Sequence, residues 1–180
     1  HVEGLVAIGV LSKDDGQALC DAMHVLAAEF ERGEFVLDET YEDGHSAIES
    51  WLSVRLGDLG KRVHLGRSRN DQAAVATRLY MRSAIERVRA ATLASGRAAL
   101  AVATAEEFTP MPGYTHLQRA VPSTVGLWMA SFAEAFADDV QLLDATLGVL
   151  ERCPLGTAAG YGVNVPLDRD GVAKTLGFAG

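Results

Sequence analysis

The sequence predicts an all-α protein built from long helices, and three observations lead to this prediction. No proline occurs between His1 and Thr109, so that stretch lacks the residue that most strongly breaks helix interiors. Apolar residues recur along most of the chain at intervals of three and four, the spacing of one helical face. No segment alternates clearly between apolar and polar residues, as a half-buried strand would.

The first two predicted helices lie before residue 34. Apolar and small residues have helical spacing over residues 1–10. Ser12 then resembles an N-terminal cap, with Asp15 in the first turn, where carboxylates stabilise a helix. The second helix is predicted to end near Gly33, because glycine is common just after a helix C-terminus.

The next helix is predicted to begin near Asp43 and to continue until Gly57–Gly60, and "KRVHLG" (61–66) is predicted to be a short extended connector. The longest predicted helix runs from Ser68 to Phe108. Its residues, about 40 in number, would span about 60 Å at 1.5 Å each. A helix of this length exceeds what one compact domain needs, so it predicts a bundle shared between subunits.

Regularly spaced apolar or small residues predict the face that each long helix turns to a partner. On the helix predicted from Ser68 to Phe108, these residues are Met81, Ile85, Val88, Thr92, Ser95, Ala99 and Val102. After a proline-rich loop, a helix capped by Ser123 or Thr124 continues the pattern with Val125, Met129, Phe132, Phe136, Val140, Leu143, Leu147 and Leu150. A loop rich in glycine and alanine follows at 153–166, and Asp168 is predicted to open a last short helix.

The net charge of −8 is unevenly distributed along the chain. Residues 1–60 have a net charge of −10, residues 61–97 of +7, and residues 98–180 of −5. The basic stretch either pairs with the acidic ones across a helix interface or attracts an anionic ligand. A nucleic-acid partner is disfavoured, because such proteins usually present a net basic surface and this chain is acidic.

Several other classes of protein are disfavoured by the sequence. Cys20 and Cys153 lie in apolar helical patterns without metal-ligand spacing, which is typical of reduced, intracellular thiols. No apolar run approaches the ~20 residues of a membrane span, so no membrane partner is expected. No metal-ligand set, glycine-rich phosphate loop or G-x-S-x-G motif occurs.

One polar cluster, "HLGRSRNDQ" (64–72), lies where the long helix begins. Unpaired backbone N–H groups at a helix N-terminus favour an anion, and the forks of Arg67 and Arg69 suit carboxylate or phosphate. The alternative is that Ser68 only caps the helix and that both arginines are solvated. The residue pattern by itself leaves these two interpretations open.

Two further clusters each contain a histidine. His116 lies in "GYTHLQR" (113–119) between prolines that stiffen the loop, so it is either an ordinary surface residue or a fixed acid–base group. His45 lies in "YEDGHSAIES" (41–50), where Asp43 as a helix cap is the simpler explanation of the polar residues. Composition and spacing alone therefore stop at a helical bundle with a candidate anion site.

The motifs taken together resemble a known family. "GRSRNDQ" (66–72), "PMPGYTHLQRAVP" (110–122), "PLG" (154–156) and "PLDR" (166–169) are similar to argininosuccinate lyases of the fumarase/aspartase superfamily, and the upstream "HVEGLVAIGVL" and "EDGHSAIESWL" fit the same family. The resemblance covers essentially all 180 residues. Two departures are Gly44, where the family usually has a β-branched residue, and "GTAAGYGVN" (156–164), where Gly-Ser-Ala-Leu-Ala-Gly is commoner.

The resemblance implies a long-helix bundle of the fumarase/aspartase type, assembled as a cytoplasmic homotetramer whose active sites draw on three subunits. Residues 1–66 would be part of an N-terminal helical domain, and residues 67–180 would begin the central bundle domain. The implied enzyme is a carbon–nitrogen lyase that needs no metal or organic cofactor. It would catalyse the reversible β-elimination of argininosuccinate to arginine and fumarate, the last step of arginine biosynthesis.

The resemblance also implies roles for individual residues. Ser68, Arg69 and Asn70 would bind substrate carboxylates, Thr115 would hydrogen-bond the substrate, His116 would transfer a proton, and His45 would be a secondary pocket residue. The family's second proton-transfer group is a serine on a Gly-Ser-Ser-x-Met-Pro loop, which does not occur in these residues. We therefore expect the chain to be an incomplete subunit that is inactive by itself.

Two alternatives to this function remain. Another fumarate-releasing lyase of the superfamily, such as a fumarase, an aspartase or an adenylosuccinate lyase, would also use arginines and a histidine around an anion. The Ser-Arg-Asn-Asp string argues against that alternative. The second alternative is a non-catalytic structural relative like the lens crystallins that share the fold.

Overall fold

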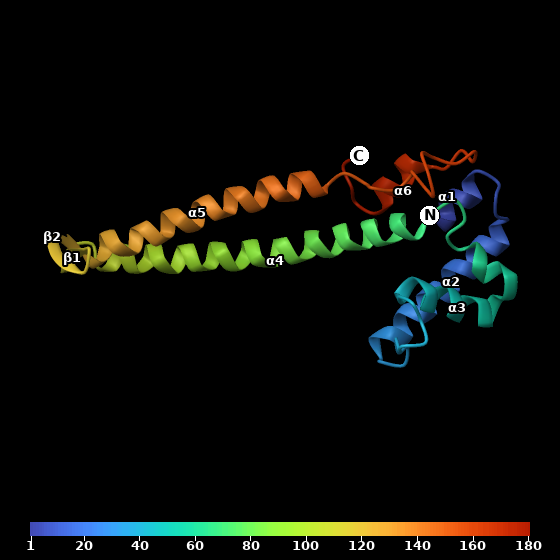
Figure 1. Cartoon of the computed structure of the whole chain (residues 1–180), viewed down its shortest axis with the longest axis horizontal. Helices are drawn as coiled ribbons and strands as arrows, with labels where there is room; N and C mark the ends of the chain where they lie inside the picture. The colour runs from blue at the N-terminus through green and yellow to red at the C-terminus, as the bar shows by residue number, and fades with distance from the viewer. The chain divides into compact units, whose positions relative to one another are not determined.

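The computed structural model describes residues 1–180 and divides into two compact units. The first, here called the terminal unit, consists of His1–Thr77 together with Glu151–Gly180. The second, here called the hairpin unit, consists of Arg78–Leu150. Both units are mainly helical, so the predicted all-α class is confirmed (Figure 1).

The helices of the terminal unit begin where the sequence predicts. They are α1 (Val2–Ala7), α2 (Lys13–Glu31), α3 (Gly44–Leu56), α6 (Arg169–Thr175) and the first residues of α4 (Arg69–Ala105). Ser12, Asp43 and Asp168 cap three of them, because each side chain accepts a hydrogen bond from the backbone N–H three residues later. These three predicted caps are confirmed.

The hydrophobic core of the terminal unit lies among α1, α2, α3 and the segment that follows α3. Leu5, Leu19 and Leu52 are fully buried in it, and Leu11 and Val63 complete its centre. Each helix contributes a leucine from the face predicted by its apolar spacing. The core therefore fixes α3, whose first turn bears His45.

The prediction of an extended connector at 61–66 is wrong. The chain instead enters a 3₁₀ helix, η1 (Gly57–Arg62), directly after α3 and continues in turns. Gly60 permits this tight return, because a Cβ atom there would lie 2.5 Å from the carbonyl carbon of Leu52. The segment thus packs back onto α3 before α4 begins.

The hairpin unit consists of the greater part of α4, a two-stranded hairpin and α5 (Val125–Leu150), and the two helices run side by side (Figure 1). The start of α5 touches the end of α4 closely. A Cβ atom on Gly126 would lie 2.7 Å from the carbonyl oxygen of Ala103 and 2.6 Å from Cα of Glu107, so glycine is required there. Thr124 caps α5 through its hydroxyl, which accepts the N–H of Leu127 at 3.0 Å.

The predicted proline-rich loop is a β-hairpin, which corrects the expectation that no strand occurs. Strand β1 (Pro110–Thr115) pairs antiparallel with β2 (Gln118–Thr124), and Pro112 lies opposite Pro122. Proline cannot donate a ladder hydrogen bond, and this ribbon is largely exposed on both faces. For both reasons the sequence lacks the apolar alternation that indicates a strand.

The predicted contact faces differ between the two long helices. On α5 the predicted face is the better-buried one, with Val140 and Leu150 buried, although Phe132 on that face is exposed. On α4 the predicted residues Met81, Val88 and Val102 are exposed in the single chain. None of the helices combines the length and the apolar character that crossing a membrane requires.

Candidate active site

The first turn of α4 is organised by a reciprocal capping pair. The Ser68 hydroxyl accepts the N–H of Asp71 at 3.2 Å, and the Asp71 carboxylate accepts the N–H of Ser68 at 2.9 Å. Asp71 is only 4% exposed, which is unusual for a carboxylate. The capping interpretation of Ser68 is therefore confirmed, and its hydroxyl proton is still available to a ligand because the cap uses the oxygen as an acceptor.

Arg69 links the start of α4 to the start of α3. Its Nη1 atom donates to Asp43 Oδ2 at 2.8 Å and to the Ser46 hydroxyl at 2.7 Å, and Glu42 lies 3.5 Å away. The pKa of the Asp43 carboxyl is held well below its ordinary value by the backbone N–H of Ser46 and by the Arg69 guanidinium. Half-buried His45 lies between Asp43 and Ser46 in the first turn of α3.

Asn70 occupies the second position of α4, and its side chain is exposed. It lies directly after Arg69 and one residue before the buried Asp71. The structure thus gathers Ser68, Arg69, Asn70 and His45, four of the six predicted site residues, around the starts of α3 and α4.

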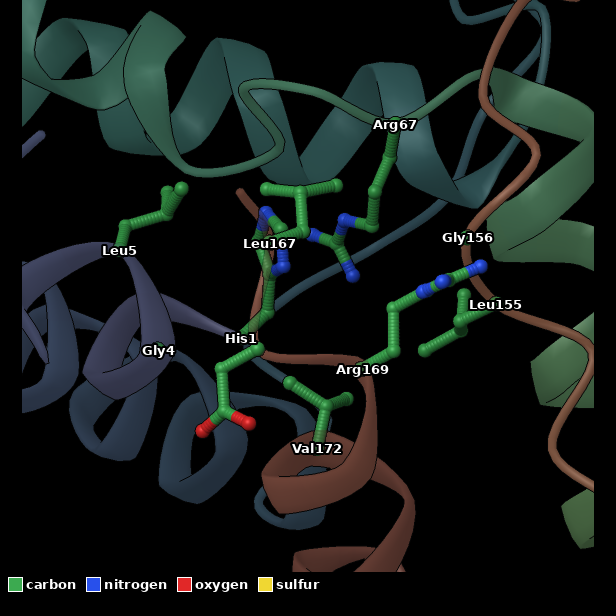
Figure 2. Close-up of a pocket in the computed structure, with 10 residues that line it drawn as sticks. His1, Gly4, Leu5, Arg67, Leu155, Gly156, Leu167, Arg169 and Val172 are labelled. Atoms are coloured by element: carbon green, nitrogen blue, oxygen red, sulfur yellow. The ribbon is translucent and has the colours of Figure 1, made fainter. Parts of the chain in front are cut away.

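Arg67 does not join Arg69. It enters a small cavity of about 20 Å³ that is also lined by Leu155, Gly156, Leu167 and Arg169 (Figure 2). Nη2 of Arg67 donates to the Val63 carbonyl at 3.2 Å, while its buried Nε has no hydrogen-bond partner. Burial lowers the pKa of Arg67, and the nearby Asp71 charge opposes that shift. Arg67 and Arg69 therefore contact different groups, and neither is simply solvated.

Thr115 and His116 lie at the tip of the hairpin, in the other unit. Thr115 ends β1 opposite Gln118, and the two residues of the turn, His116 and Leu117, have φ values of 49° and 63°. Two-residue hairpin turns with both φ values positive normally contain Asn-Gly. A histidine and a leucine held in this region store backbone strain, a feature that is common at functional sites. His116 is exposed, so its imidazole is accessible.

The predicted site residues therefore form two groups, one in each unit. No group of three or more His, Cys, Asp or Glu side chains is placed to hold a metal ion. The sequence reasoning overlooked one functional candidate, Thr157, whose hydroxyl donates to Asp71 Oδ1 at 3.1 Å across 86 residues of sequence. No local pattern indicates this bond, although the Ser-x-x-Asp spacing at 68–71 is a signal for the capping pair itself.

A protein-family model described as "Lyase" matches residues 2–180. The chain belongs to this lyase family. A curated relative named argininosuccinate lyase, from Sorangium cellulosum (strain So ce56), is 58% identical over 180 residues, which are all of this chain and 42% of the relative. Another relative of the same name, from Stenotrophomonas maltophilia (strain R551-3), is 51% identical over 179 residues, 99% of this chain and 42% of the relative.

Solved structures of lyases share the fold. A crystal structure of EDDS lyase in complex with formate is 28% identical with a TM-score of 0.86, covering 100% of this chain and 35% of that one. A fumarate lyase from Mesorhizobium sp. BNC1 is 26% identical with a TM-score of 0.70, covering 97% of this chain and 41% of that one. The lyase chain thus spans less than half the length of the relatives that it matches.

These comparisons confirm the resemblance that the motifs indicate, and with it the long-helix lyase fold. The assignment as a lyase is likewise confirmed at the level of the family. They do not test the individual site residues or the predicted division at residue 66, which stay predictions.

Proposed function

We propose that the gene product that carries this lyase chain is an argininosuccinate lyase, which cleaves argininosuccinate reversibly into arginine and fumarate. The observation that supports this most strongly is the 58% identity to a relative of that name over the whole chain. An identity of 51% to a second relative over 179 residues supports the same substrate. We place the reaction in the cytoplasm, at the last step of arginine biosynthesis.

The reaction needs two proton movements and one bond cleavage. A base removes a proton from the carbon next to a carboxylate, and the resulting carbanion charge spreads onto that carboxylate. The C–N bond then breaks, its electron pair leaves with the guanidino nitrogen, and an acid returns a proton to that nitrogen. Such a path depends on fixed donors around the carboxylates, because charge builds up there in the transition state.

We assign the donors to the group around α4. Ser68, Arg69 and Asn70 bind substrate carboxylates, and His45 completes this part of the pocket. The free hydroxyl proton of Ser68 supports its role, since the helix cap uses only the oxygen atom. The exposed Arg69 can exchange its bonds to Asp43 and Ser46 for a substrate carboxylate, which a guanidinium binds in a two-pronged geometry.

We assign proton transfer to His116 and a substrate hydrogen bond to Thr115. The exposed, strained turn supports these roles, because it holds the imidazole at the end of a hairpin and keeps it accessible. The second proton-transfer group would be a serine outside the 180 residues. No step here is assigned to a metal or an organic cofactor.

We propose that the enzyme is a homotetramer in which each active site takes residues from different copies of the chain. Large apolar side chains that a single copy leaves exposed support this assembly: Tyr80, Met81, Val88, Leu100, Val102, Leu127, Trp128, Phe132, Leu142 and Val149 on α4 and α5. Burial against other copies would cover this surface, as in other helix bundles.

A second fumarate-releasing reaction is a candidate because of one observation: the chain has a TM-score of 0.86 to EDDS lyase, and a variant of that enzyme has been solved with bound fumarate. The experiment is to follow fumarate by its ultraviolet absorbance, offering the purified gene product argininosuccinate, adenylosuccinate, aspartate, malate or EDDS separately. We expect release from argininosuccinate only. Release from another substrate alone would replace the proposed function, and a folded protein that turns over none of them would indicate a crystallin-like structural role.

A further inference from the structure

A loop between α5 and α6 is tied to the start of α4 through one buried carboxylate. The Thr157 hydroxyl donates to Asp71 Oδ1 at 3.1 Å, while the N–H of Ser68 donates to Asp71 Oδ2 at 2.9 Å. Asp71 is 4% exposed, so water cannot readily replace either donor. Its two oxygens are thus divided between a distant loop and the cap of its own helix.

The loop itself is held so that it can present this hydroxyl. The N–H of Gly162 donates to the Thr157 carbonyl at 2.9 Å. Gly156, with φ of +127°, lies against Arg169, and a Cβ atom there would come within 2.4 Å of that arginine's Cδ. Figure 2 shows Leu155 and Gly156 on one side of the cavity that Arg67 enters. Thr157 therefore follows two residues that line the same cavity as Arg67 and Arg169.

Loss of the Thr157 hydroxyl would disturb the hydrogen bonds at the start of α4. A buried carboxylate that lacks one donor gains by rotating towards another, and rotation of Asp71 would disturb the bond that it accepts from Ser68. Ser68, Arg69 and Asn70 are consecutive and precede Asp71 directly. Their orientation therefore depends on the same carboxylate.

From this geometry we propose that Thr157 is a positioning residue for substrate binding. Through Asp71 it holds the first turn of α4 in the orientation in which Ser68, Arg69 and Asn70 meet the substrate carboxylates. The inference rests on the proposed function for its substrate, but its structural part does not. Thr157 itself touches no reacting atom.

The kinetic test compares three variants of the gene product in the fumarate assay. Thr157→Val keeps the shape of the side chain and removes the donor, so KM should rise about tenfold with little change in kcat, because uniform binding is lost. Thr157→Ser keeps the donor and should stay within about twofold of the wild type. Thr175→Val is the matched control, since that hydroxyl donates only to the Gly171 carbonyl within α6 and its loss should not change KM.

Two outcomes would overturn the proposal. One is a Thr157→Val enzyme with unchanged KM, even if its melting temperature falls, because that result indicates a merely structural role. The other is an effect of Thr157→Val that is just as large in an Asn70→Leu background, because residues that act through one another should not be additive.

A second measurement separates this proposal from the proposed function. Amide hydrogen exchange at residues 68–72 should be several-fold faster in Thr157→Val than in the wild type, and unchanged in Thr175→Val, whatever the substrate is. If the wild type does not cleave argininosuccinate, the proposed function fails, and this exchange experiment still decides whether Thr157 holds the helix start. Unchanged exchange would overturn the positioning role.

Discussion

Replacing His116 by asparagine should lower the rate of the reaction while leaving the stability of the fold almost unchanged. His116 has a φ of 49°, in the left-handed region that asparagine adopts more readily than most residues. The side chain is exposed, so the substitution removes little packing. We therefore expect the free energy of unfolding to change by no more than about 0.5 kcal/mol, as for other surface substitutions.

The rate should change far more than the stability. A positioned proton-transfer group typically contributes 10²–10⁴-fold, which corresponds to about 2.7–5.5 kcal/mol of activation free energy. Asparagine cannot exchange a proton near neutral pH. For His116→Asn we thus expect kcat to fall by about 10²-fold or more, with a smaller change in KM.

The assay is fumarate release by the purified gene product, measured beside its melting temperature. Leu117→Asn is the matched control, since Leu117 has a φ of 63°, is 96% exposed and lies in the same turn. This control introduces the same residue but keeps the imidazole, so its kcat should stay within about threefold of the wild type. A His116→Asn enzyme with near-normal kcat, or a Leu117→Asn enzyme that is equally impaired, would refute the assignment.

Two further predictions concern stability. The Asp43 carboxyl has a lowered pKa, so its charge stabilises the fold above the ordinary aspartate pKa of about 3.9 and this contribution is lost as the pH falls below it. The melting temperature of Asp43→Asn should therefore lie below that of the wild type at pH 6 and converge with it in acid, and a constant difference would contradict the assigned cause. Gly126→Ala should lower the free energy of unfolding by about 1–3 kcal/mol, because its Cβ would overlap the end of α4. In the same helix, a Cβ atom on Gly148 would have no atom within 4 Å, so Gly148→Ala should raise the free energy of unfolding by about 0.5–1 kcal/mol. Calorimetry that shows equal effects for the two alanine variants would contradict the packing argument.

Helix starts were predictable from the sequence because their causes are local. Ser12, Asp43 and Asp168 each accept an N–H from only three residues ahead, so the residue type and its neighbours contain the whole signal. The long helices were predictable for a similar reason, since apolar spacing persists over many turns without proline.

The hairpin was not predictable by the usual signals. Its strands contain three prolines, which normally argue against a ladder, and its turn is His-Leu instead of Asn-Gly. The positive φ values at 116 and 117 are imposed by the hairpin and not by the preferences of those residues. The strain that marks His116 in the structure therefore has no counterpart in the sequence.

Within the candidate site, the sequence suggested candidate residues but not the partners that they have in the structure. The bonds from Arg69 to Asp43 and from Thr157 to Asp71 join residues that are 26 and 86 positions apart, and only the packed fold brings them together. The sequence left open whether the arginines at 67 and 69 bind an anion or are solvated, and in the structure one enters a cavity and the other reaches α3. Two side chains that are close in sequence at the start of a helix can therefore point in different directions.

The central claim is that the group around Ser68, Arg69 and Asn70 works with His116 from a different copy of the chain. It is tested most directly by mixing two strongly impaired variants of the gene product, Asn70→Leu and His116→Asn, under conditions in which subunits exchange. Random mixing in equal amounts leaves both residues intact at about a quarter of the composite sites, so about a quarter of the wild-type rate of fumarate release should return. Mixed assemblies that form but release fumarate no faster than the separate variants would contradict the claim.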